Sequence, residues 1–94
     1  MKGVLKFEKI LLSNLLVSWC RDHVFNVLDT QIDKEGVTVV TDYGSIYGTR
    51  NNRYLVFGSG RLLSLGLLAS GEDFSEVLDK MNIWFEANAK KLKK

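Results

Sequence analysis

The sequence contains no proline, and cysteine and histidine each occur once, as Cys20 and His23. A single cysteine excludes a framework of intramolecular disulfides, and a single histidine excludes most histidine-rich metal sites. No apolar run approaches the roughly 20 residues that a membrane-spanning helix needs. The sequence therefore predicts a domain held together by its hydrophobic core, with no metal and no cofactor.

The net charge of the chain is also small. Thirteen lysines and arginines stand against eleven aspartates and glutamates, a formal net charge of +2 over 94 residues. This surplus is too small to predict a polyanionic partner by itself. Apolar residues make up 46% of the chain, which is typical of a globular protein. A chain of this length has room for one core, so we expect a single domain over residues 1–94.

The N-terminal segment resembles a secretory signal only superficially. Glu8 interrupts its basic region, and Ser13 and Asn14 split its apolar run. Trp19 stands where signal processing requires a small residue. We therefore expect a cytoplasmic protein in which Cys20 is a reduced thiol in the core.

The clearest helix lies at the C-terminus. Apolar residues recur there at helical spacing on one face, at Phe74, Val77, Leu78, Met81, Trp84, Phe85 and Leu92. Ser70 is in a position to cap the helix start. The acidic residues of its first turn and the lysines of its last turn suit the helix dipole.

The middle of the chain reads as a series of antiparallel strands. Alternation and β-branched residues predict strands over 36–42, 45–50, 53–57 and 61–69. Turn residues separate them at 43–44, 51–52 and 58–60, and Asn51 and Asn52 tolerate the positive φ of a tight hairpin.

Residues 4–29 allow two interpretations. As one helix they would be apolar around most of the circumference, which is hard to bury in so small a domain. We therefore favour a strand over 9–17 followed by a short helix over 19–28, with the single helix as the alternative. The predicted fold is α+β, a curved antiparallel sheet of four to five strands with helices packed on one face, in the order β-α-β-β-β-β-α.

Alternation along the last hairpin assigns its two faces. We expect the helices to cover the face that carries Tyr54, Val56, Leu62, Ser64, Gly66 and Leu68. The face left open would carry Leu55, Phe57, Leu63 and Leu65, ringed by Arg50, Arg53 and Arg61. An open apolar face of this kind requires a partner.

Residues 55–66, LVFGSGRLLSLG, resemble a hairpin of the TATA-box-binding protein family. In that hairpin an aliphatic pair and a phenylalanine precede Ser-Gly, a basic residue, two aliphatics and a glycine. The resemblance implies one half of that family's saddle, so that a homodimer would supply the other half. It implies that Phe57 wedges between base steps, that Leu55, Leu63 and Leu65 line the groove surface, and that Arg61 contacts phosphate. Leu65 replaces a threonine common in the family, and Lys9 stands where the family keeps a groove-reading asparagine. Similar half-domains accompany some ribonucleases H and DNA glycosylases, and small signal recognition particle proteins share the element order.

The stretch 43–71 has three arginines and no acidic residue. Together with three tyrosines, these guanidinium groups could hold phosphates while the rings stack on bases. We therefore predict a non-enzymatic nucleic-acid-binding protein, with duplex DNA favoured over RNA, whose binding residues are Arg50, Arg53, Leu55, Phe57, Arg61, Leu63 and Leu65.

A second hypothesis uses the same leucine-rich face to bind another protein, as a small regulator or inhibitor would. Catalysis has little support, because His23 has no suitable nucleophile nearby in the sequence and Cys20 is expected to be buried. The Gly58-Ser59-Gly60 segment is too short for a phosphate-binding loop.

Overall fold

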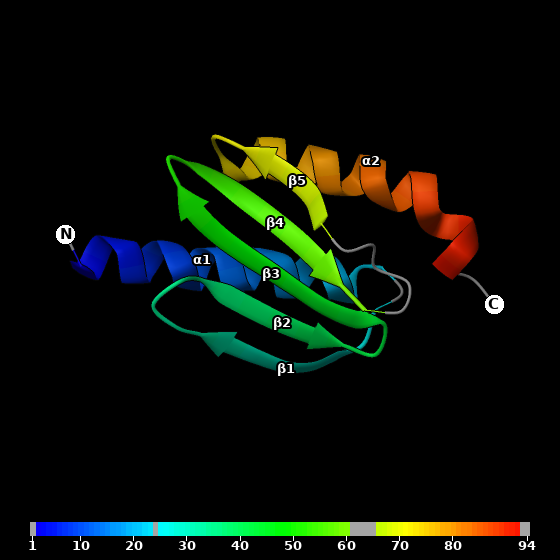
Figure 1. The fold of residues 1–94 in the computed structure, drawn as a ribbon, viewed down its shortest axis with the longest axis horizontal. Helices are drawn as coiled ribbons and strands as arrows, with labels where there is room; N and C mark the ends of the chain where they lie inside the picture. The colour runs from blue at the N-terminus through cyan, green and yellow to red at the C-terminus, as the bar shows by residue number, and fades with distance from the viewer. Residues whose placement is uncertain (1, 24, 61–65, 93–94) are drawn as a thin grey trace.

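One antiparallel sheet and two helices make up the structure, a computed structural model that describes residues 2–23, 25–60 and 66–92. The elements are, in chain order, α1 (Lys2–Arg21), β1 (Val27–Ile32), β2 (Val37–Thr41), β3 (Gly44–Asn51), β4 (Arg53–Ser59), β5 (Gly66–Gly71) and α2 (Phe74–Leu92). The strands lie in the order β1-β2-β3-β4-β5, and both helices lie on the same side of the sheet (Figure 1). The predicted α+β class is confirmed, with both helices on one face of an open antiparallel sheet.

The prediction for the N-terminal segment was wrong. Residues 9–17 are not a strand, because they lie within one continuous helix, α1. Residues 19–28 are not a separate helix, because α1 continues to Arg21 and β1 begins at Val27. The buried apolar residues described in α1 recur at helical spacing and form one stripe toward the sheet: Leu12, Leu16, Trp19 and Cys20. Leu15 and Val17 are partly buried against the same core. Ile10 and Leu11 stay 40% and 38% exposed.

The fifth strand is β1, which the sequence did not predict because the favoured helix ran through its first residues. The chain order is therefore α-β-β-β-β-β-α. The strands predicted over 36–42, 45–50 and 53–57 are present as β2, β3 and β4, and the described part of the strand predicted over 61–69 lies in β5. Asn52 takes the expected positive φ of 75° between β3 and β4. Gly58 and Ser59, predicted as a turn, belong to β4, and Gly60 follows them with a φ of 126°. Residues 61–65 lie outside the described residues.

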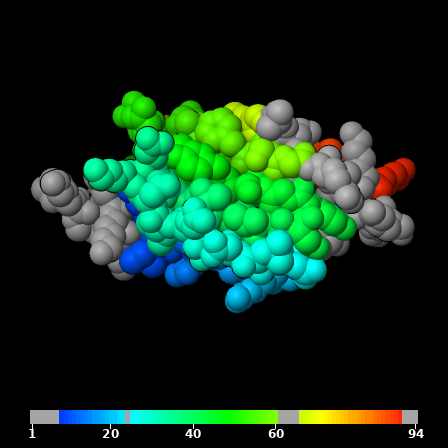
Figure 2. Space-filling view, turned by 60° about the horizontal axis from the view of Figure 1, so that its bottom comes forward, coloured from blue at the N-terminus to red at the C-terminus, as the bar shows by residue number. Residues whose placement is uncertain are grey.

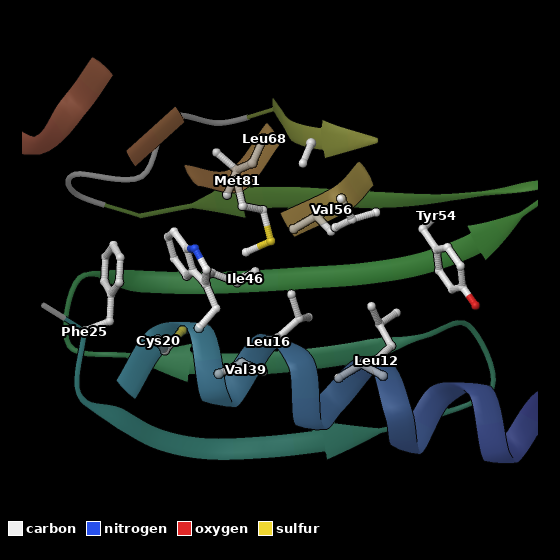
Figure 3. Close-up of a cluster of buried hydrophobic side chains, with 14 residues drawn as sticks. Leu12, Leu16, Cys20, Phe25, Val39, Ile46, Tyr54, Val56, Leu68 and Met81 are labelled. Atoms are coloured by element: carbon white, nitrogen blue, oxygen red, sulfur yellow. The ribbon is translucent and has the colours of Figure 1, made fainter. Parts of the chain in front are cut away.

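The core lies between the helices and the sheet (Figure 3). The buried stripe of α1 packs over β1, β2 and β3, and α2 packs over β4 and β5. Between them the sheet supplies fully buried aliphatic side chains, among them Val37, Val39, Ile46 and Val56. The indole Nε1 of Trp19 donates to Asn82 Oδ1 at 2.8 Å and so links α1 to α2.

The start of α2 differs from its prediction by three residues. Ser70 lies in β5, and Asp73 caps the helix instead, accepting a hydrogen bond from the Glu76 N–H at 2.9 Å. The Glu76 carboxylate accepts from the Glu72 N–H at 2.8 Å, one residue before the cap, so both acidic side chains hold backbone N–H groups at the helix start. In the described parts of the chain, neither helix is long and apolar enough to cross a membrane.

Candidate binding face of the sheet

One face of the sheet is not covered by either helix, and we call it the open face. Strand register assigns its residues, which alternate with the buried ones. The strands β2, β3 and β4 form the front of the molecule in Figure 2, where green marks β3 and β4. The open face consists of Asp29, Gln31, Thr38, Val40, Ser45, Tyr47, Thr49, Asn51, Arg53, Leu55, Phe57, Ser59, Leu67 and Ser70.

Two aromatic rings occupy the centre of the open face. Tyr47 of β3 pairs directly with Phe57 of β4, and the row continues to Thr38 on one side and Leu67 on the other. Both aromatic residues are half-buried, whereas Leu67 is 55% exposed. Cross-strand neighbours on one face lie about 5 Å apart at Cβ. The Tyr47 ring extends toward Gly36, where an added Cβ would lie 3.2 Å from its Cζ, so the two aromatic residues are neighbours in register but their rings do not stack on each other.

A bulge in β5 sets which residues of that strand reach the open face. Val56 pairs with Ala69, but the next residue, Phe57, pairs with Leu67, so Leu68 is the extra residue. Leu68 and Ala69 are both buried, and Leu67 is left exposed beside Phe57. The face assignment of Tyr54, Val56 and Leu68 is therefore confirmed, because all three are buried.

The two described arginines of the predicted set lie on opposite faces. Arg50 pairs in register with the buried Tyr54, so it lies on the helix side, where its Nη1 is 3.1 Å from the Glu8 carboxylate. Its guanidinium also lies 5.1 Å from the centre of the Tyr54 ring. Arg53 precedes Tyr54 and lies on the open face with Leu55 and Phe57, and it has no carboxylate partner among the described residues.

Other predicted residues cannot be placed or lie elsewhere. Arg61, Leu63 and Leu65 fall outside the described residues. Lys9 lies on α1, on the helix side, where its Nζ donates to the backbone carbonyls of Asp33 and Lys34 at 2.7 Å each. It therefore holds the β1–β2 turn against the helix and does not reach the open face.

The open face is rich in hydroxyl groups and poor in negative charge. Its only carboxylate among the described residues is Asp29, on the edge strand β1. Burial, and then the charge of Glu35, raise the pKa of Tyr47 above its usual value, so its hydroxyl stays protonated at neutral pH.

The residues of the open face that were not among those predicted from the sequence include Thr38, Val40 and Leu67. The first two follow from alternation along 36–42, but Leu67 depends on the bulge.

The described residues also contain no cluster of three or more His, Cys, Asp or Glu that could hold a metal. Cys20 is fully buried, as expected. His23 stacks on Trp19 with ring centres 4.4 Å apart, and its Nδ1 lies 2.7 Å from the Trp19 carbonyl oxygen. These contacts account for His23 as part of an aromatic cluster at the end of α1.

The burial of Cys20 predicts that its thiol reacts slowly in the native protein. Desolvation, with a smaller contribution from Asp42, raises the pKa of this thiol to about 12. Because the thiolate is the reactive form, alkylation of the native protein at pH 7.5 should be at least about a thousandfold slower than in denaturant. The pKa of this thiol is higher in the folded than in the unfolded protein, so the free energy of unfolding should fall as the pH rises above 9, where the unfolded thiol ionises. Cys20→Ala should remove the part of this fall in stability that the thiol causes. Rapid native alkylation would contradict the buried position.

The candidate site is thus a surface whose described residues include two aromatic rings, several hydroxyls and Arg53, on adjacent strands. Such a surface can bind through stacking, hydrogen bonds and apolar contact. Comparisons of the chain with protein-family models, with curated proteins and with solved structures find no match.

Proposed function

We propose that this protein is a non-enzymatic binding protein whose open face holds single-stranded nucleic acid, DNA or RNA. The observation that carries the proposal is the direct pairing of Tyr47 and Phe57 at the centre of that face. Adjacent aromatic side chains on a sheet are a common platform for unpaired bases, because every base can stack on a ring.

The charges on the open face also favour a nucleic acid as the ligand. Arg53 is on the face with the two rings and has no described carboxylate partner, so its guanidinium can neutralise a phosphate. Across β2 to β5, no described residue of the open face is acidic. A polyanion therefore meets little repulsion over the strands that carry the rings.

The geometry favours a single strand over the duplex expected from sequence. A minor-groove wedge needs a side chain that projects between base steps. Phe57 is half-buried and pairs with Tyr47 on one neighbouring strand and Leu67 on the other, so it lies within a row of side chains across the open face. Unpaired bases can lie on such a surface without the cost of unstacking a duplex.

The two arginines beside the β3–β4 turn provide a matched test. Binding of labelled oligo(dT), oligo(rU) and a mixed-sequence duplex is measured by fluorescence anisotropy over a range of salt concentrations. For single strands, log Kd should change with log salt by about 0.7 for each phosphate neutralised. Arg53→Gln should weaken binding and lower that slope by roughly one phosphate, whereas Arg50→Gln, on the helix side, should leave both unchanged. Equal effects of the two substitutions, or no binding of either single strand at low salt, would refute the proposal.

A second candidate function is a contact with another protein through the same face. The 55% exposure of Leu67, beside Leu55 and Phe57 on neighbouring strands, favours it. Interface centres are typically aromatic and aliphatic with few charges, as this face is. Phe57→Leu separates the two candidates, because leucine keeps the apolar contact but cannot stack on a base.

A further inference from the structure

The outer edge of β1 has backbone groups that no other strand of the sheet satisfies. β1 is the first strand in the sheet order, so only β2 pairs with it. The Asp33 N–H donates to the Gly36 carbonyl at 2.9 Å, at the end of the β1–β2 ladder. Backbone groups alternate in an antiparallel pair, so Gln31 faces β2 while Thr30 and Ile32 face outward. The Thr30 N–H accordingly donates to the Asp29 side chain at 2.9 Å and not to β2.

The same edge carries exposed apolar side chains and no basic residue or proline. Leu28 and Ile32 are 65% and 46% exposed. Lysine and proline are common on edge strands that must stay unpaired, and β1 has neither. Next to this edge, Val17, Arg21, Val27 and Leu28 help to line a groove of about 420 Å³ between α1 and β1.

From this arrangement we propose that two copies of the chain pair through their β1 edges, antiparallel and centred on Thr30. In this register Thr30 lies opposite Thr30, and Leu28 of each copy lies beside Ile32 of the other. Each Ile32 then enters the groove lined by Val17, Val27 and Leu28. Two exposed apolar pairs become buried, and the outward groups of Thr30 and Ile32 gain strand partners.

Charge selects this register over its neighbours. A shift that centres the pairing on Asp29 places two carboxylates opposite each other, and a shift that centres it on Gln31 places Asp29 opposite Asp33. Centring on Thr30 places Asp29 opposite the Gln31 amide, which can donate to it.

Pairing requires one exchange of hydrogen bonds. The Thr30 N–H must leave the Asp29 carboxylate of its own copy and donate to the Thr30 carbonyl of the other. The dimer is independent of what binds the open face. It joins the two open faces into one sheet of twice the width, in which β1 and β2 of each copy separate the two pairs of aromatic residues.

Sedimentation velocity without any nucleic acid tests this proposal. Wild type should associate to a dimer as concentration rises, and Ile32→Glu should weaken the dimer by about a hundredfold, since each dimer loses two apolar contacts. Thr30→Pro removes the outward N–H, which β2 does not use, and should weaken it similarly. Ile83→Glu is the matched control because Ile83 is likewise an exposed isoleucine, at 65% against 46% for Ile32, but lies on α2, and it should leave the dimer unchanged.

Three results would overturn the proposal. One is a wild-type monomer at concentrations up to about 1 mM, where even a weak dimer would form. Another is a dimer that survives both Ile32→Glu and Thr30→Pro, each shown by circular dichroism to be folded. The third is a dimer lost with Leu67→Glu on the open face but kept with Ile32→Glu. Since no ligand is present, none of these results depends on the proposed function.

Discussion

Replacing Tyr47 and Phe57 together with alanine is expected to weaken the binding of single-stranded nucleic acid by at least about thirtyfold. Each base stacked on an aromatic side chain contributes about 1–3 kcal/mol, and the two rings pair at the centre of the open face. Since 1.4 kcal/mol corresponds to a tenfold change in Kd, the loss exceeds the error of an anisotropy titration. Each single substitution should cause part of the loss.

Two controls give this prediction its specificity. Ile83→Ala removes an exposed apolar side chain from α2, on the helix side, and should leave binding unchanged. Phe57→Leu retains apolar bulk, so its effect should approach that of Phe57→Ala if the ring stacks on a base. A double alanine variant that is folded and binds oligo(dT) and oligo(rU) as tightly as wild type would exclude the stacking platform.

The largest effect on stability is expected at Gly44, where β3 begins. Its φ is 144°, and a Cβ at this position would lie 2.1 Å from the Ser59 carbonyl oxygen and 2.9 Å from the Gly60 Cα. Both contacts are with backbone, so relief requires β3 and β4 to separate at their paired ends. Gly44→Ala should therefore lower the free energy of unfolding by about 3 kcal/mol, or at least about 10 °C in Tm.

Gly66 provides the control for the clash itself. It has a similar positive φ of 126°, but a Cβ there would meet no atom of the described residues within 4 Å. Gly66→Ala thus adds backbone strain without the contact, and its effect should be clearly smaller. If thermal melts give the same decrease in Tm for the two variants, β3 and β4 do not approach each other at Gly44 as closely as the distances above require.

Strand periodicity carried most of the fold prediction. Residues 36–57 alternate between buried and less buried positions, which one-sided burial of a sheet imposes, and the asparagine turn fixed their pairing. The N-terminal segment gave no such signal, because α1 has more apolar residues than its buried stripe needs. Ile10 and Leu11 obscured the helical period, and the short polar strand β1 followed without a strong pattern.

The candidate site was predictable in part for the same reason. Leu55 and Phe57 share a face by alternation, and their position opposite the helices follows from the burial of Tyr54 and Val56. The position of Arg50 depended on the register across Asn52. Pairing Arg50 with Tyr54 brings it to the helix side, near a glutamate 42 residues earlier in the chain. The resemblance to the TATA-box-binding protein hairpin stays a prediction, since part of its motif, residues 61–65, lies outside the described residues.

An NMR titration of the labelled protein with oligo(dT) tests most directly whether the open face is the binding surface. Amide and side-chain signals of Tyr47, Arg53, Leu55 and Phe57 should shift as the ligand is added, while those of α2 stay in place. Shifts centred on the helices, or none at all with either oligo(dT) or oligo(rU), would contradict the account.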